Sequence, residues 1–318
     1  MSLLSHMSLL FDLALVAGLI ALALHVVVTR DGRGAILAFI AFGLLLGIGW
    51  ARLASVDVAL TEAAIGGGLT GMLLLRAQTH LARHAPQEVP LQPARRRWLV
   101  PAIACGLVTL ALGAVVLAFP RPGPSLAHQA VASLETTGLG NPVTAVLLAY
   151  RAIDTLLEKI VLILALVGVW SLSRDGAWGG ASQLRPAIVP EPLVFLARVL
   201  PPFGVLIAVY QVWVGADLPG GTFQAGTILA AMALLVMLAG LRPAPPTQAR
   251  ALRLMLAGGP ALFVLVGFLG VAVAQGFLSY PEAIAKPLIV GIEAALTLSI
   301  AGTLALLVAG PPDRAPEP

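Results

Sequence analysis

Long apolar runs separated by short polar segments dominate the hydrophobic pattern of the chain. Most runs are close to the ~20 residues that cross a bilayer as a helix, and they lack the shorter alternating segments of a membrane β-barrel. We therefore predict an all-α integral membrane protein with about nine transmembrane helices. One of them, at 193–213, contains two adjacent prolines, which should break or kink it. The nine are expected at residues 11–28, 34–50, 57–76, 98–119, 141–170, 193–213, 222–241, 254–278 and 287–308.

The composition supports a membrane protein and argues against an independent enzyme. Of 318 residues, 59% are hydrophobic and 11% are charged, whereas a soluble domain has about 25% charged residues. The sequence contains no Walker phosphate loop, nucleophile elbow, Cys-x-x-Cys pair or dinucleotide fingerprint. We therefore predict a membrane protein without catalytic activity of its own, with no cofactor and no metal. The net charge of +4 does not indicate a nucleic-acid partner, because its positive residues lie in short loops.

Arginines in alternate loops predict the orientation of the chain. The loop at residues 76–97 contains five arginines, and the loops after the first, fifth and seventh predicted spans are also arginine-rich. Positive loops stay on the cytoplasmic side of a membrane. We therefore expect a multi-pass protein of the bacterial inner membrane, with the N-terminus outside and the C-terminus in the cytoplasm.

The predicted span at residues 141–170 carries four charged residues near its middle, namely Arg151, Asp154, Glu158 and Lys159. Each ionisable side chain at membrane depth costs at least ~2.5–3.5 kcal/mol and should face protein or a water cavity. The spacing places the first three on one stripe of a helix, with Lys159 pointing about 100° away from Glu158. Two interpretations follow. The charges form either a structural polar pin between helices or a proton or ion relay.

Three further acidic residues lie in or at the ends of predicted spans. Asp57 begins the third span, where an N-cap role is the simplest explanation. Glu62 lies about 7 Å deeper along the same helix. Glu293 is five or six residues into the last span. The glycines at 66–68 and 71 follow Glu62, and they predict either close helix packing or a local π-type bulge.

Three segments resemble a known family of antiporter subunits. Residues 55–77, SVDVALTEAAIGGGLTGMLLLRA, resemble the membrane protein MbhD, which also forms part of the C-terminal region of MrpA, the large subunit of Mrp antiporters. Residues 141–170 resemble the MbhE-type segment that follows it there. Residues 215–235, GADLPGGTFQAGTILAAMALL, and 292–298 resemble the Mrp antiporter subunit MrpB, also called MnhB. That family usually has a histidine in the turn, where this chain reads Ala216-Asp217 and Gly221-Thr222.

The resemblance implies three segments in the family's order. These are an MbhD-like three-helix segment at 1–90, an MbhE-like two-helix segment at 91–180 and an MnhB-like four-helix segment at 181–318. It implies a membrane subunit of a multisubunit Na⁺/H⁺ antiporter of the Mrp type, which contributes to the intramembrane ion path and to assembly. Its expected partners are other antiporter-like membrane subunits, the lipid bilayer, H⁺ and Na⁺.

Other functions fit the same residues. One is an ion-translocating adaptor in a membrane-bound hydrogenase or another complex I-like redox pump. Another is a scaffold subunit whose charges are structural. A stand-alone transporter is weaker, because no inverted repeat or matched pair of broken helices is evident. By resemblance, the proton or sodium path would use Glu62, Asp154, Glu158 and Lys159, together with Arg151, Asp57 and Glu293.

Overall fold

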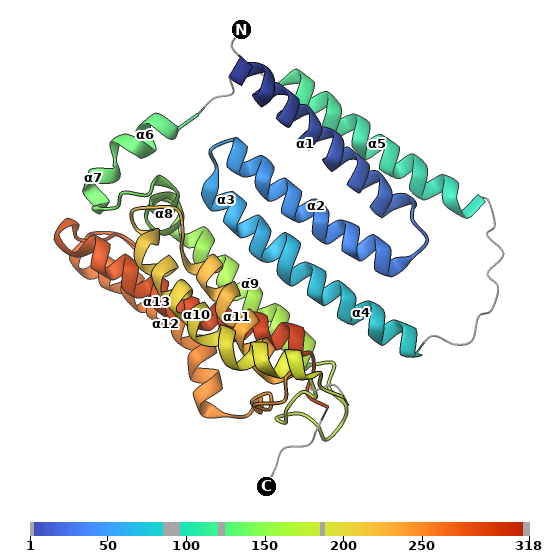
Figure 1. Cartoon of the computed structure of the whole chain (residues 1–318). Coiled ribbons are helices and arrows are strands. Elements are labelled where there is room, and N and C mark those ends of the chain that lie inside the picture. The colour runs from blue at the N-terminus through green and yellow to red at the C-terminus, as the bar shows by residue number, and fades with distance from the viewer. Residues whose placement is uncertain (1–2, 85–95, 120–124, 185–187, 314–318) are drawn as a thin grey trace.

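The computed structural model describes residues 3–84, 96–119, 125–184 and 188–313, and every regular element longer than an isolated bridge there is a helix (Figure 1). The N-terminal elements are α1 Leu3–Val28, α2 Gly32–Arg52, α3 Val56–Thr61, η1 Glu62–Thr70, α4 Gly71–His84 and α5 Arg96–Ala118. The middle elements are α6 Ala127–Ala132, α7 Leu134–Thr137, α8 Pro142–Ala145, η2 Val146–Tyr150 and α9 Ala152–Trp170. The C-terminal elements are α10 Glu191–Gly215, α11 Thr222–Leu238, α12 Arg250–Val273, η3 Glu282–Ile284 and α13 Ala285–Ala309.

Seven helices among the described residues are long and apolar enough to cross a membrane. They correspond to the predicted spans one to four, six, eight and nine. The other two predicted spans are also helical. The apolar helix α11 has 17 residues, and α9 carries Asp154, Glu158 and Lys159 within its 19 residues. The all-helical membrane fold is therefore confirmed. Among the described residues, seven helices meet the length and hydropathy expected of a membrane span.

The N-terminal group is a row of three long helices, in which α2 lies between α1 and the continuous rod α3–η1–α4 (Figure 1). The rod contains a π-helix over Glu62–Thr70, at the glycine run. A Cβ placed on Gly43 of α2 would lie 2.9 Å from the backbone nitrogen of Gly67. Both predictions for the glycine run are therefore confirmed, because these residues form a π-helix and also permit backbone-to-backbone packing.

Gly43→Ala should destabilise this row of helices. The added methyl group meets backbone atoms of η1, which cannot move aside as a side chain can, and overpacking of this kind costs about 1–3 kcal/mol. Gly106→Ala in α5 is the matched control, since its Cβ would have nothing within 4 Å. Thermal unfolding in mild detergent should show a lower Tm for Gly43→Ala only. Equal Tm values for the two variants would contradict the close packing.

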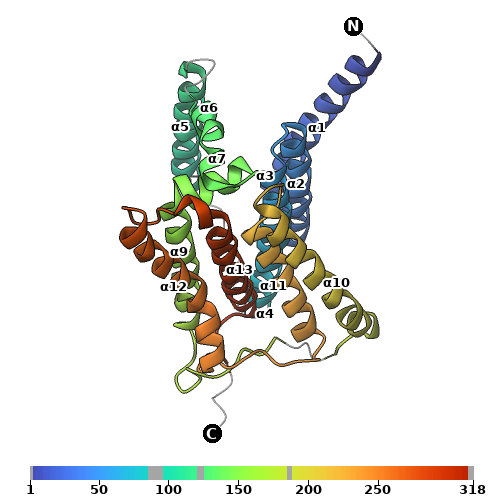
Figure 2. The same ribbon diagram turned by 90° about the vertical axis from the view of Figure 1, so that its left-hand side faces the viewer.

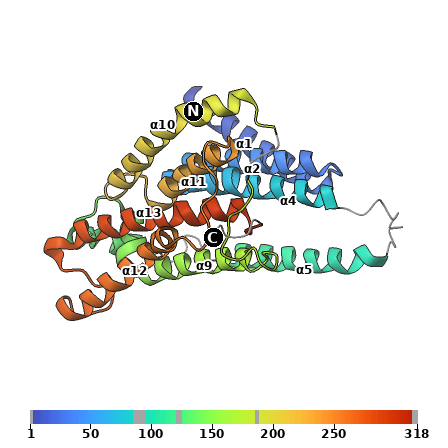
Figure 3. The ribbon, with the colours of Figure 1, turned by 90° about the horizontal axis from the view of Figure 1, so that it is seen from below.

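The C-terminal group is built around α13, which contacts α11, α12 and α9, while α10 packs on α11 (Figures 2 and 3). The buried face of α13 includes Ile289, Ile292, Leu296 and Ile300. Of the predicted break or kink at the adjacent prolines, the break is wrong, since α10 is an uninterrupted helix that includes them. A proline ring holds φ near −65°, which is a helical value. Because proline has no N–H to donate, the carbonyl one turn earlier loses its hydrogen bond, but the helix can continue.

The predicted eighth span extends too far. α12 ends at Val273, and the chain then folds back, with the amide of Leu278 donating to the Gly267 carbonyl at 3.3 Å. Gln275 and Leu278 have positive φ values of 61° and 60° in this turn. The hydrophobic pattern did not reveal this end, because the returning residues are themselves apolar and partly buried against α12.

Polar contacts join the N-terminal rod to the C-terminal group near each end of the rod. The guanidinium of Arg76 in α4 donates to the carbonyl oxygens of Val308 and Ala309 at the C-terminal end of α13. A cation at a helix C-terminus also meets the negative end of the helix dipole. Near the other end of the rod, Asp57 of α3 accepts a hydrogen bond from the amide of Gly220 at 2.9 Å.

Candidate functional site

The charged fifth span is not the continuous helix that the sequence predicts. The short helix α8 passes into the π-helix η2, and Arg151 then leaves helical geometry with φ −127° and ψ 37° before α9 begins. Such a break frees carbonyl groups that need partners at membrane depth. Thr155 Oγ1 donates to the Leu147 carbonyl at 2.6 Å, and the Tyr280 hydroxyl donates to the Leu148 carbonyl at 2.9 Å. Burial raises the pKa of the Tyr280 phenol, so it remains a donor.

Thr155→Val and Tyr280→Phe should each weaken the broken helix. Each change leaves a partly buried carbonyl without its donor, which costs about 1–3 kcal/mol. Tyr150→Phe is the matched control, because Tyr150 donates to the Ala130 carbonyl on an exposed part of the chain. Unfolding in detergent should show a lower midpoint for Thr155→Val and Tyr280→Phe than for Tyr150→Phe. If all three match the parent chain, the two donors do not stabilise the break.

A cavity of about 310 Å³ lies beside the broken helix. Its walls come from α3, α8, η2, α9, the turn before α11, the start of α11, and α13, so all three predicted segments contribute to it. A water molecule takes about 30 Å³ in the liquid, which means that this space can hold several. The charged side chains that line it are Asp57, Glu158, Lys159 and Glu293. Four of the seven predicted site residues therefore line one space.

Lys159 is the buried cation of this cavity. Its side chain is 2% exposed, and its Nζ has no hydrogen-bond partner among the described residues. The ammonium group lies 3.4 Å from the centre of the Phe223 ring and 4.0 Å from Glu158 Oε2. A cation–π contact offsets only part of the cost of burying a charge. Glu158 is 51% exposed, so the two side chains differ in burial although their charged ends lie within 4.0 Å of each other.

Glu293 places a carboxylate on another wall of the cavity, beside the N-terminus of α11. It is 2% exposed, and its Oε1 accepts a hydrogen bond from the Thr222 hydroxyl at 3.2 Å, while Oε2 has no partner among the described residues. The positive end of the α11 dipole favours a negative charge at this place. Gly221, with φ 133°, allows the chain to turn there, and a Cβ on it would lie 3.6 Å from Glu293 Oε1.

Asp57 lines the cavity, but the prediction that it is an N-cap is wrong. Ser55 precedes the helix as its N-cap residue, and Asp57 lies in the first turn. Its carboxylate instead reaches the turn before α11 and accepts from the amide of Gly220. Gln224 extends the same contact, donating to Thr61 Oγ1 at 3.1 Å and to the Asp57 carbonyl at 3.4 Å. Capping rules consider one helix, so they could not identify a partner more than 160 residues later in the chain.

The other three predicted residues do not line the cavity. Arg151 and Asp154 form an ion pair at 2.6 Å, with side chains 71% and 48% exposed, on the outer side of the broken helix. The Glu62 carboxylate folds along its own π-helix, where a Cβ on Gly66 would lie 2.0 Å from Oε1. Glycine at position 66 therefore provides the room for this carboxylate.

Sequence reasoning missed five uncharged polar residues that line the cavity, namely Thr61, Thr144, Thr155, Thr222 and Gln224. Threonine is too frequent in membrane helices to attract notice. Gln224 carried a usable signal, because a glutamine inside a predicted span needs hydrogen-bond partners just as a charged residue does. With them, the cavity combines one ammonium group, three carboxyl groups and several neutral oxygens. Hard oxygen ligands of this kind suit a proton, water or a small alkali cation.

Comparisons with known proteins identify two regions of the chain. Residues 17–83 match the MbhD family of MBH subunits, and residues 192–311 match a domain related to the MnhB subunit of Na⁺/H⁺ antiporter. A comparison with curated proteins gives no significant match.

Two solved structures are similar to the chain. A chain of the Mrp complex from Dietzia sp. DQ12-45-1b is 25% identical, with a TM-score of 0.73, over 96% of this chain and 35% of that one. The present chain thus spans about a third of the length of that relative. A chain of the membrane-bound sulfane sulfur reductase, an archaeal respiratory membrane complex, is 24% identical, with a TM-score of 0.54, over 67% of this chain and 96% of that one. The chain therefore joins an MbhD-like region and an MnhB-like region in one polypeptide, and it is similar over 96% of its length to a chain of an Mrp complex.

Proposed function

We propose that the chain is a membrane subunit of a multisubunit Na⁺/H⁺ antiporter of the Mrp type, and that it contributes to the ion path and to assembly. The observation that carries this proposal is the cavity between the MbhD-like and MnhB-like regions, which contains a buried lysine and a buried glutamate. A space with three carboxyl groups and one ammonium attracts cations and can hold or release a proton. No activity independent of the complex is expected.

The proposed path uses the predicted residues in three groups. Asp57, Glu158, Lys159 and Glu293 would act in the cavity. Arg151 and Asp154 lie on the exposed side of the broken helix and would continue the path toward a neighbouring subunit. Glu62 would act from the π-helix of the N-terminal rod. Sodium and protons are the proposed ions, because the matched MnhB family is related to a subunit of Na⁺/H⁺ antiporters.

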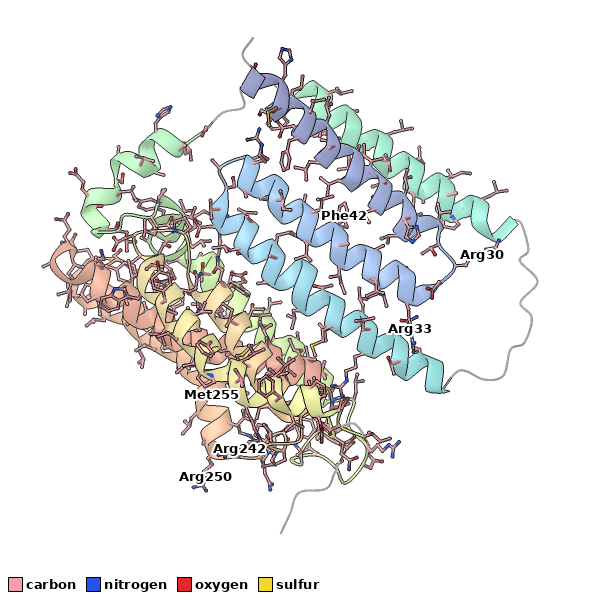
Figure 4. All side chains as sticks on the ribbon, viewed as in Figure 1. Arg30, Arg33, Phe42, Arg242, Arg250 and Met255 are labelled. Carbon is pink, nitrogen blue, oxygen red and sulfur yellow. The ribbon has the colours of Figure 1, made fainter. Side chains whose placement is uncertain are left out.

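The proposed topology has nine spans, with α9 and α11 added to the seven long apolar helices. The N-terminus would lie outside and the C-terminus in the cytoplasm of a bacterial cell. Figure 4 supports this orientation, because the arginines of two separate loops, 30 and 33 in one and 242 and 250 in the other, lie toward the same end of the helices. The proposed segments are an MbhD-like one at 1–90, an MbhE-like one at 91–180 and an MnhB-like one at 181–318.

A second candidate function is that of an adaptor in a redox-driven complex. Its support is the similarity in fold to a chain of a respiratory membrane complex. Purification of the tagged chain from mild detergent, with mass spectrometry of the proteins that accompany it, separates the two. Antiporter-like subunits without redox proteins are expected. Iron–sulfur or hydrogenase-type subunits would favour the redox-driven complex, and a chain purified alone would contradict both.

A further inference from the structure

A second cavity, of about 480 Å³, lies in the C-terminal group and is separate from the charged one. It is a groove whose walls come from α10 and α12 and whose floor is α11 and α13. Its lining is apolar except at one end, and includes Val205, Met232, Met237, Met255 and Ala301. Two of the lining residues are well exposed, Val205 at 47% and Leu298 at 54%, so the groove opens on the surface that would face lipid or another subunit.

Methionine gives the groove an adaptable wall. Three of the six methionines of the chain, Met232, Met237 and Met255, line it. Methionine side chains are unbranched and adjust to irregular apolar shapes. Glycines leave space for two of them, since a Cβ on Gly204 would lie 2.4 Å from Met232 Cγ and a Cβ on Gly302 would lie 2.3 Å from Met255 Cε. A groove of this kind suits a flexible hydrocarbon chain better than a rigid ring system.

Arg242 closes one end of the groove and is the one charged residue in its described lining. It is exposed, and its guanidinium forms no hydrogen bond or ion pair with the described residues. Figure 4 shows Arg242 and Arg250 near each other at the end of the helices, with Met255 further along the group. An arginine at the membrane surface binds a phosphate through paired N–H donors.

We propose that this groove binds one acyl chain of an anionic phospholipid whose phosphate is held by Arg242. The apolar walls would take the chain, and the positive end would take the headgroup at the level where headgroups lie. Basic pockets between transmembrane helices on the cytoplasmic side are known to bind anionic lipid headgroups. The site lies on the MnhB-like region alone and does not depend on the ion path.

The size of the groove argues for a lipid chain and against a helix of another subunit. One turn of an α-helix, a cylinder about 10–12 Å wide and about 5.4 Å long, occupies roughly 420–610 Å³. The groove of 480 Å³ would therefore enclose little more than a single turn, and a docked helix would lie mostly outside it. A single hydrocarbon chain is much narrower and can follow the groove from Arg242 toward Val205.

Native mass spectrometry of the purified full chain can test the site, with phosphatidylglycerol and phosphatidylcholine of identical acyl chains as the probes. Phosphatidylglycerol should bind more tightly than phosphatidylcholine. Arg242→Glu should weaken phosphatidylglycerol binding by about fivefold or more and leave phosphatidylcholine binding unchanged. Arg242→Lys keeps the positive charge, so it should keep most of the preference for phosphatidylglycerol over phosphatidylcholine. That result would show that the position tolerates substitution. Arg30→Glu, at an exposed arginine in the arginine-rich loop after α1, is the matched control and should change neither affinity.

The location of the acyl chain needs its own measurement. Ala233 is an exposed residue of the groove, and Ala233→Trp should fill it and weaken the binding of both lipids. A phosphatidylglycerol with a photoreactive acyl chain should label peptides that contain Met232 or Met255. Equal affinity of the parent chain for both lipids would overturn the proposal. So would labelling that is confined to other helices, or cross-linking of a second protein to the groove in the intact complex.

Discussion

Replacing Lys159 by methionine is expected to abolish sodium-driven proton movement by the assembled complex. The rate in inverted vesicles should fall at least about tenfold, which corresponds to ~1.4 kcal/mol in the barrier. Lys159 is the cation among the charged groups that line the cavity, and its ammonium has no hydrogen-bond partner among the described residues. Methionine keeps much of the length of the side chain and removes the charge, so packing against Phe223 should be largely retained.

The chain provides a close control for this variant. Its one other lysine, Lys286, is 40% exposed and pairs with Asp217 at 2.7 Å, away from the cavity. Lys286→Met should leave transport near the parental rate and cost at most about 1 kcal/mol in stability. Normal transport by an assembled Lys159→Met complex would refute the proposed path. Loss of assembly before loss of transport would instead indicate that the charges are structural.

Glu293→Gln should also stop antiport without preventing assembly, with a loss of at least about tenfold, or ~1.4 kcal/mol. The amide keeps the shape of the side chain and an oxygen that can accept from Thr222, but it cannot carry a proton or a negative charge. Glu282→Gln, at an exposed position just before α13, is the control and should transport normally. A Glu293→Gln complex with parental antiport would show that this carboxylate is not part of the path.

The double variant tests whether the two buried charges act together. Lys159 and Glu293 line one cavity from different helices. If they serve a single relay, the combined loss should be no larger than that of either single variant, because removing one partner already stops the transfer. If the two losses multiply, the residues contribute independently.

The long helices could be predicted from the sequence, because apolar length is a local signal, and the two regions that match family models were recognisable from their motifs. The glycine run was equally informative, and both of its predicted consequences are found in η1. The charged span was harder. Its break at Arg151 is stabilised by Thr155 within the segment but also by Tyr280, which lies 132 residues after its partner Leu148. No local pattern could reveal that second contact.

The candidate site was predicted in its chemistry but not in its arrangement. Intramembrane charge is costly wherever it occurs, so all seven residues could be chosen from the sequence. Which of them meet depends on the packing of α3, α9 and α13, and on a turn that places Thr222 beside Glu293. That packing separates the cavity residues from the exposed pair Arg151 and Asp154, although all lie in similarly apolar surroundings in the sequence.

The contacts of Arg76 and Asp57 limit how the charged cavity can open. They fasten the same rod to the C-terminal group at two separated points, one near each end. Two attachments of this kind resist a rigid-body rocking of one half of the chain against the other. Such rocking is a common way for a transporter to expose a site to alternate sides of a membrane. Access to the buried charges would then be switched by small internal changes, such as a rotation of Lys159 away from Phe223 or a shift of hydrogen-bond register in η1. The helices would thus keep their arrangement during transport, while side-chain rotations and the π-helix η1 would supply the movement.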